Sequence, residues 1–233
     1  MVSTRSSSVA LNSTPETLPT PAKTPRSRKA ASRTTSSVSA SVSAAPSAWS
    51  HTPTALTLLW LAVSLPLVTW DTGYVLGRPL TMEGGSLHWP IWTPYKLYGE
   101  VDHIYGWKAF NAGNGFTSAQ GTLNVIETVM YIAYVYLWNK NKAADGSVRG
   151  REGGLALLLG WGAALMTLSK TVLYWLNEYY AGFDNIGHNS LVNLIFLWII
   201  PNGAWLVFPT YMIFSMGSDI LDAFTLASHD KSE

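Results

Sequence analysis

The fold is decided by the stretch Gln120-Gly121-Thr122-Leu123-Asn124-Val125-Ile126-Glu127-Thr128-Val129-Met130-Tyr131-Ile132-Ala133-Tyr134, a mostly apolar run with a carboxylate near its middle. Extended to Trp138, the run is long enough to cross a bilayer as a helix, which takes about 20 residues at a rise of about 1.5 Å per residue. Helical spacing places five residues on one face: Gln120, Asn124, Glu127, Tyr131 and Tyr134. Because a charged side chain at bilayer depth costs at least about 2.5 kcal/mol, Glu127 is expected to face a bundle interior and to have a partner there.

The composition of the 233-residue chain is typical of a membrane protein. Hydrophobic residues make up 48% and charged residues 12%, about half the charged share of an average soluble protein. The 11 tryptophans and 11 tyrosines agree, because their amphipathic rings are favoured at the interface between lipid and water. The absence of cysteine excludes disulfides, thiol nucleophiles and thiolate metal sites.

Polar residues divide the chain into three regions. Residues 1–51 are rich in Ser, Thr, Ala and Pro and have almost no large apolar residues, so they cannot offset the entropy of ordering and are predicted to be a disordered tail. An organellar transit peptide is the alternative, but four prolines between residues 15 and 25 disfavour the amphipathic helix that it requires. Residues 52–225 are predicted to form a transmembrane domain, and residues 226–233 a polar tail.

Four segments are predicted to cross the membrane as helices: 55–76, 117–138, 154–177 and 190–217. The fold class is therefore all-α, a polytopic membrane protein built as a four-span helical bundle, with a fifth span left open. The long first loop, 77–116, is rich in Gly, Pro and aromatic residues and is expected to form an ordered cap over the mouth of the bundle. Pro201 and Gly203 are expected to interrupt the fourth helix.

Basic residues near the spans predict the orientation. The link 139–153 carries four of them, and with an even number of spans both termini lie on the same side as this link. Because basic residues favour the cytosolic side, the termini are predicted to be cytosolic. The basic residues of the 77–116 loop count against this orientation.

Each predicted span carries polar residues on one stripe. Asp71, Glu127, Lys170 and Asn202 come from four different spans, and convergence on a common interior is the simplest packing that hides them from lipid. Glu127 and Lys170 have opposite charges, so they are either an ion pair that locks the helix packing or the polar end of an aromatic-walled ligand pocket. Three aromatic residues share these stripes: Tyr131, Tyr174 and Trp205.

Patterns typical of other chemistries are missing. The five histidines lack metal-ligand spacing, and we expect neither a metal nor a cofactor. We find no Walker loop, dinucleotide fingerprint or Ser-His-Asp pattern. The basic tail lacks the interleaved aromatic residues of a nucleic-acid binder, so no nucleic-acid partner is expected. The expected partners are the bilayer and a lipophilic small molecule, and a homodimer is left open.

Four motifs follow one another in a characteristic order and spacing. They are Asp71 at the end of the first span, Ile126-Glu127-Thr128, Val172-Leu173-Tyr174-Trp175-Leu176-Asn177-Glu178 followed by Gly182-Phe183, and Asn202-Gly203-Ala204-Trp205-Leu206-Val207-Phe208-Pro209. In these motifs, residues 55–225 resemble the EXPERA family of membrane proteins, which includes emopamil-binding protein, a Δ8-Δ7 sterol isomerase, and the sigma-2 receptor. The resemblance implies a small helical bundle in the endoplasmic reticulum membrane, with a lipid-shaped pocket that opens within the bilayer.

By position, the resemblance assigns five residues to the pocket: Asp71, Glu127, Thr128, Asn202 and Trp205. This chain departs from the isomerase at Leu67, where the isomerase has a histidine, and at Thr171, where it has an acid. An alkene isomerase needs a strong, well-placed proton donor, so the missing histidine disfavours ordinary sterol isomerisation. The pair of acids without that histidine is closer to the sigma-2 pattern of ligand binding.

We therefore expect an integral membrane protein of the endoplasmic reticulum that binds a sterol or a sterol-like lipophile. The candidate catalytic residues are Glu127 and Asp71. The candidate ligand contacts are Thr128, Tyr131, Lys170, Tyr174, Asn202 and Trp205. Enzyme activity is left open: one alternative is a sterol or terpenoid double-bond isomerase that works by protonation and deprotonation, and another is a structural or trafficking partner without catalysis.

Overall fold

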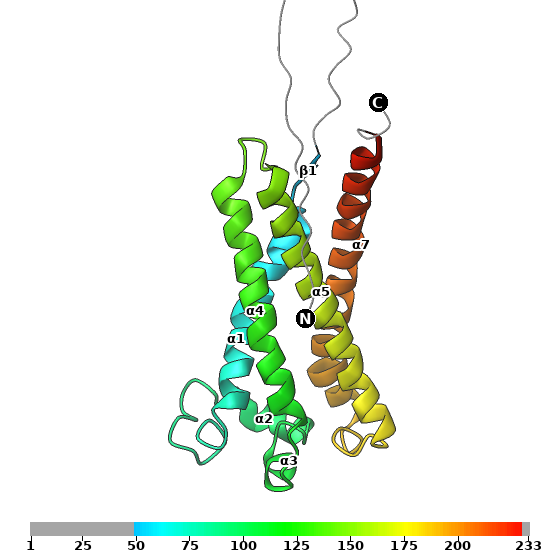
Figure 1. The fold of residues 1–233 in the computed structure, drawn as a ribbon. Helices are drawn as coiled ribbons and strands as arrows, with labels where there is room; N and C mark the ends of the chain where they lie inside the picture. The colour runs from blue at the N-terminus through cyan, green and yellow to red at the C-terminus, as the bar shows by residue number, and fades with distance from the viewer. Residues whose placement is uncertain (1–48, 230–233) are drawn as a thin grey trace, which may run out of the picture. The chain divides into compact units, whose positions relative to one another are not determined.

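Four long helices dominate residues 49–229, the part of the chain that the computed structural model describes (Figure 1). They are α1 (Ala55–Leu76), α4 (Phe116–Asn141), α5 (Gly150–Tyr180) and α7 (Ile200–His229). Helix α1 begins after Thr54, whose side-chain oxygen accepts a hydrogen bond from the backbone N–H of Thr57 at 3.1 Å. All four predicted segments are thus helical, although α5 extends past the predicted range 154–177 at both ends.

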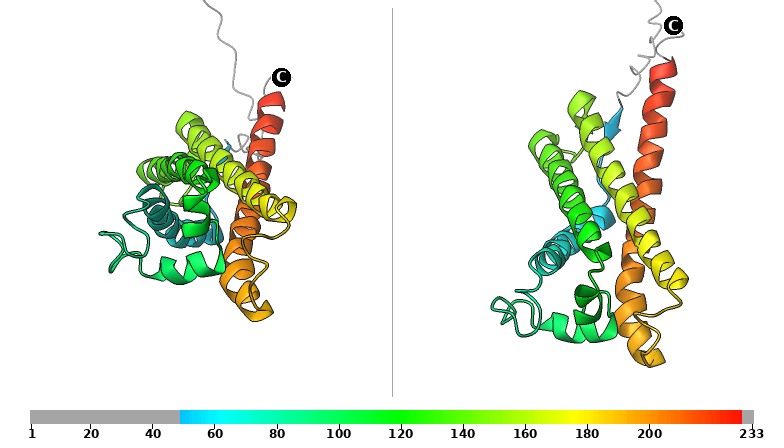
Figure 2. Two further views of the ribbon diagram at one scale, coloured as in Figure 1. Left: turned by 90° about the horizontal axis from the view of Figure 1, so that it is seen from below. Right: turned by 60° about the horizontal axis from the view of Figure 1, so that its bottom comes forward.

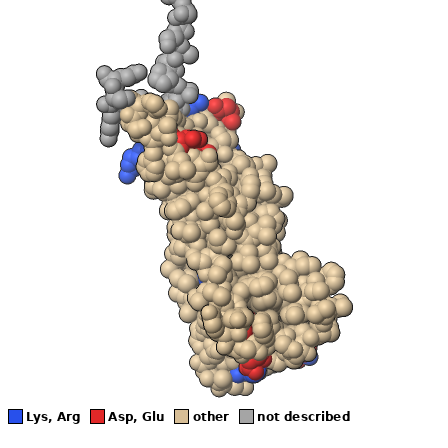
Figure 3. Space-filling model, turned by 90° about the vertical axis from the view of Figure 1, so that its right-hand side faces the viewer, with Lys and Arg blue, Asp and Glu red and all other residues tan. Residues whose placement is uncertain are grey.

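Three of the helical segments are long and apolar enough to cross a membrane: Ala55–Leu76, Gly150–Tyr180 and the continuous Leu191–His229. Helix α4 has 26 residues but is not among them, because polar residues such as Asn124 and Glu127 reduce its apolar character. On the face shown in Figure 3, acidic and basic residues gather near the two ends, and the long middle is almost free of them. The chain is compatible with an integral membrane protein, and a crossing by α4 stays a prediction.

The fourth predicted segment departs most from expectation. It begins as a single turn, α6 (Leu191–Asn193), continues as the π-helix η1 (Leu194–Ile199) and then becomes α7. Pro201 has no N–H to donate, so the wider π turn lies directly before the proline and the helix continues instead of breaking. The expected end near residue 217 is wrong as well, because α7 continues to His229, into the region predicted to be a polar tail.

Helix α5 packs against both α4 and α7. The core between them contains buried aromatic and aliphatic residues, among them Tyr131, Tyr134 and Met212. Gly160 of α5 allows a close approach, since a Cβ atom there would lie 3.1 Å from the ring of Tyr134 and 3.0 Å from Met216.

The loop between α1 and α4 is folded over one end of the bundle. It contains α2 (Pro94–Val101) and α3 (Trp107–Asn111), and α2 lies across the ends of the long helices (Figure 2). Arg78 joins this loop to α4, because its guanidinium donates hydrogen bonds to the Thr117 hydroxyl at 2.6 Å and to the Val75 carbonyl at 3.2 Å. We call residues 77–115 the cap.

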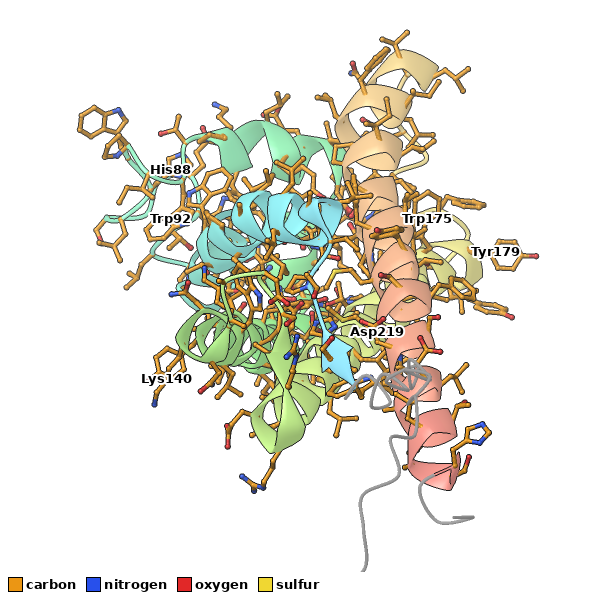
Figure 4. All side chains as sticks on the ribbon, turned by 90° about the horizontal axis from the view of Figure 1, so that it is seen from above. His88, Trp92, Lys140, Trp175, Tyr179 and Asp219 are labelled. Carbon is orange, nitrogen blue, oxygen red and sulfur yellow. The ribbon has the colours of Figure 1, made fainter. Side chains whose placement is uncertain are left out.

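The predicted disordered tail includes residues 50 and 51, but these two residues form a strand, so the prediction is wrong there. Strand β1 (Ser50–His51) pairs in antiparallel register with β2 (Val148–Arg149). His51 is buried, and its ring nitrogens lie 2.6 Å from Asp219 Oδ2 and 3.0 Å from the Tyr134 hydroxyl. Figure 4 shows Asp219 beside this strand. Partners on two distant helices order this short segment, and the predicted tail 1–48 lies outside the described residues.

Candidate functional site

A cavity of about 420 Å³ lies among α1, the cap, α4, α5 and the segment from η1 to α7. Its volume is within the usual range of about 300–1,000 Å³ for small-molecule sites. The aromatic lining residues are Trp70, Tyr95, Tyr98, Tyr105, Tyr174, Phe196 and Trp205. The lining residues with polar or charged side chains, apart from the tyrosines and tryptophans, are Asp71, Gln120, Asn124, Lys170, Thr171 and Asn202. The cavity therefore combines aromatic walls with a small polar region.

The polar region is a hydrogen-bonded chain across three helices. Asp71 of α1 accepts a hydrogen bond from the Tyr95 hydroxyl at 2.6 Å and one from the Asn124 amide at 3.4 Å. The Lys170 ammonium donates to the amide oxygen of Asn124 and, at 3.0 Å, to Glu127 Oε2. The structure thus brings together the predicted residues Asp71, Glu127 and Lys170, with Asn124 as the link between them.

Glu127 lies behind this region and does not line the large cavity. Its Oε2 also accepts a hydrogen bond from the Thr167 hydroxyl at 2.9 Å, and its Oε1 is buried without a hydrogen-bond partner among the described residues. Glu127, Thr128 and Tyr131 border a separate void of about 10 Å³, too small for a lipid. These three candidates are therefore placed one layer away from the cavity.

The remaining predicted contacts border the cavity from α5 and α7. Tyr174 and Asn202 line it, and Trp205 lies between it and the small void. The Asn202 amide donates to the Trp198 carbonyl at 2.8 Å and to the Tyr98 hydroxyl at 3.4 Å, so Asn202 connects the π-helical segment to the cap. Asn202 shares the cavity with Asp71 and Lys170 but makes no hydrogen bond to either.

Asp102 of the cap is a buried acid that sequence analysis did not select. Its carboxylate accepts hydrogen bonds from the Tyr174 hydroxyl, the Trp198 indole at 2.8 Å and the Ile104 backbone N–H at 3.1 Å. Burial raises the pKa of Asp102 to about 6, although the hydrogen bonds from Tyr174 and Trp198 act in the opposite direction. The side chain holds two aromatic residues in place at the cap end of the cavity.

The aromatic wall from the cap was also missed, although its sequence carries a signal. Tyr95, Tyr98 and Val101 recur at intervals of three residues, a spacing that places them on one face of a short helix. The Tyr95 ring stacks on Tyr74 with 3.8 Å between ring centroids. Burial raises the pKa of the Tyr98 hydroxyl, so this group stays a neutral hydrogen-bonding partner.

Several lining residues are also exposed on the outside of the bundle. Leu67 of α1 is 42% exposed, Leu97 of α2 is 54% exposed and Phe196 of η1 is 64% exposed. A residue that both lines a cavity and faces outward lies at its mouth, and these three are apolar. An apolar mouth admits a lipophile more readily than a polar solute.

Within residues 49–229 there is no group of three or more His, Asp or Glu residues that could hold a metal ion. Comparison with family models, with curated proteins and with solved structures gives no match. The EXPERA resemblance stays a prediction from the motifs. The cavity itself is lined by the Lys170 ammonium and the Asp71 carboxylate, with the Glu127 carboxylate behind Lys170, an arrangement suited to hydrogen bonding or to acid–base chemistry.

Proposed function

We propose that this chain is a four-span membrane protein that binds a sterol or a sterol-like lipophile in the cavity between α1, α5 and the cap. The single observation that carries the proposal is a cavity of about 420 Å³ with aromatic walls, an apolar mouth and Asp71 in its polar region. An amphiphile with a rigid apolar body and one polar group matches this distribution of side chains.

The four-span topology includes α4 as a crossing helix. Its polar residues face other helices: Asn124 and Glu127 contact Lys170 of α5, and Asn124 also contacts Asp71 of α1. Its outward residues are apolar, for example Val129 and Ile132. A helix whose polar residues face partners inside a bundle can cross the bilayer despite its lower hydropathy. We place the protein in the endoplasmic reticulum membrane with cytosolic termini, following the resemblance and the distribution of basic residues.

Filling the cavity tests the proposal. Leu197→Trp adds volume at the cavity wall, whereas Val207→Trp adds the same side chain on the exposed face of α7 and is the matched control. Purified protein in detergent would be labelled with a photoreactive sterol, with competition by unlabelled sterol. We expect loss of specific labelling in Leu197→Trp alone. Equal labelling of both variants and wild type would place the sterol elsewhere.

Removing the charge at Asp71 tests whether this carboxylate binds the polar group of the sterol. We expect Asp71→Asn to weaken binding of a 3-hydroxysterol by about tenfold, because a hydrogen bond to a charged group is worth about 1.5–3 kcal/mol and one to a neutral group about half as much. Asp184→Asn, at an exposed acid of the loop after α5, is the matched control. Unchanged affinity in Asp71→Asn would show that the polar end of the ligand lies elsewhere.

A sterol or terpenoid double-bond isomerase is the second candidate. It is favoured by the presence of a carboxyl group and an ammonium in one apolar cavity, since isomerisation needs a proton donor and a proton acceptor near the same ligand. Incubation with a Δ8-sterol in deuterated water discriminates the two. An isomerase gives a shifted double bond with incorporated deuterium, whereas a binding protein returns the sterol unchanged.

A further inference from the structure

Lys170 is the one lysine among residues 49–229 that lines the cavity. Its side chain is 11% exposed, whereas the side chains of Lys96 and Lys108 are 52% and 48% exposed at the cap surface. An ammonium that served only to neutralise Glu127 would not need to border a ligand-sized cavity. The position of Lys170 at the cavity wall indicates that its side chain contacts the ligand.

The partners of Lys170 are those that a reactive amine requires. Glu127 Oε2 lies 3.0 Å from Nζ and can take a proton from it, and Thr167 holds this carboxylate from the other side. Asn124 accepts a hydrogen bond from the same ammonium and so orients it. Lys170 also borders the cavity, so a carbonyl group bound there lies within reach of its side chain.

We propose that Lys170 forms an imine with the carbonyl carbon of a lipophilic ketone or aldehyde in this cavity, with Glu127 as proton acceptor and counter-ion. This inference rests on the proposed function and names a ligand class for the same cavity. A fixed cation also disfavours cationic ligands and favours a ligand with a hydrogen-bond acceptor, such as a carbonyl group.

Formation of the imine needs only Lys170, Glu127 and the carbonyl compound, and it releases one water molecule. The Lys170 ammonium passes one proton to Glu127, and the neutral amine attacks the carbonyl carbon to form a new C–N bond. A proton moves from nitrogen to oxygen to give a carbinolamine. The proton on Glu127 then leaves with the hydroxyl group as water, and the C–O bond breaks. The protonated imine remains beside the Glu127 carboxylate, so the charge of the polar region is unchanged.

Reductive trapping tests the inference. Purified protein in detergent is incubated with a 3-oxosterol and sodium cyanoborohydride, and tryptic peptides are mapped by mass spectrometry. We expect about a tenfold excess of reduced adduct on Lys170 over Lys140 and Lys142, because a bound carbonyl meets Lys170 at a high effective concentration. Lys170→Arg keeps a cation for Glu127 but forms no imine, so its adduct should be absent.

Competition against the photoreactive sterol measures occupancy in the same samples. Occupancy by the 3-oxosterol without an adduct on Lys170 overturns the imine and leaves lipophile binding intact. A 3-oxosterol that does not displace the photoreactive sterol overturns the imine, and absence of specific labelling by the photoreactive sterol itself overturns the proposed function. An adduct that is equally abundant on the exposed lysines also overturns the inference, because it reports reaction in bulk solvent. These outcomes are read on the wild-type protein and do not depend on a variant that folds.

Discussion

Replacing one member of the Glu127–Lys170 pair should cost far more stability than replacing both. The two side chains are 4% and 11% exposed and lie 3.0 Å apart, and they join α4 to α5. Lys170→Met leaves the Glu127 charge buried with only the Thr167 hydroxyl as a donor, and Glu127→Leu leaves the ammonium without its counter-ion. The double variant removes both charges and fills the space with apolar atoms.

The structure sets the size of the expected effect. Breaking a buried pair by removal of one partner costs about 3–5 kcal/mol, whereas apolar replacement of the whole pair is often neutral. We therefore expect each single variant to lose about 3 kcal/mol or more, and the double variant to lie within about 1 kcal/mol of wild type. The coupling energy of this double-mutant cycle, which is the sum of the two single losses minus the double loss, should therefore be about 5 kcal/mol or more.

Equilibrium unfolding of the purified protein in mixed detergent and SDS gives the free energy of unfolding of the wild type, of each single variant and of the double variant. The pair Lys108–Asp184 is the matched control, since its atoms lie 2.8 Å apart but its side chains are 48% and 65% exposed. Its cycle should give a coupling energy below about 1 kcal/mol. A Glu127–Lys170 coupling as small as that of the control, or a double variant as unstable as the sum of the single variants, would refute the reasoning.

Three further changes test other parts of the fold. Asp102→Asn should flatten the pH dependence of stability. Because the folded-state pKa of Asp102 is raised to about 6, this group adds stability at low pH that is lost as pH rises through about 6. The pKa shift corresponds to about 3 kcal/mol of stability. The free energy of unfolding, measured at several pH values between about 4 and 8, tests this pH dependence. Gly160→Val should cost about 1–3 kcal/mol, because its side chain would overlap the Tyr134 ring, and thermal unfolding reports this loss where Gly160→Ala should be milder. His51→Leu should cost about 2 kcal/mol by leaving the Tyr134 hydroxyl and Asp219 without a ring-nitrogen partner, and proteolysis near residue 50 should become faster.

The partner of Glu127 could be predicted from the sequence because a bilayer leaves few alternatives. A carboxylate on an otherwise apolar helix needs a compensating group, and Lys170 is the basic residue within another predicted span. Local spacing also placed Asp71 and Asn202 on inward stripes, and both line the cavity. These inferences needed only helical periodicity and the cost of an unpaired charge.

The position of the cavity could not be predicted in the same way. It lies toward the cap, on the Asp71 side of Asn124, and the cap supplies much of its aromatic wall. The three-residue spacing of Tyr95, Tyr98 and Val101 indicates a short helix within the loop, but it does not fix where that helix lies against the bundle. Tyr131 shares the stripe of Glu127, and Thr128 is its neighbour in the sequence, but both border the small void instead, because Lys170 and Asn124 lie between Glu127 and the cavity. The helix face of a residue shows in which direction its side chain points from the helix axis. It does not show at which level along the helix the cavity lies.

The two carboxylates of the site differ in the partners that they already have. Glu127 has a cation at 3.0 Å, whereas the direct hydrogen-bond donors to Asp71 are the neutral side chains of Tyr95 and Asn124. A ligand that enters the cavity therefore meets one carboxylate without a direct cationic partner and one ammonium already paired with an acid. The first favours a hydrogen-bond donor on the ligand, and the second favours an acceptor or a carbonyl carbon. A lipophile that carries both kinds of group would use the whole polar region, and a hydrocarbon without either would use only the aromatic walls.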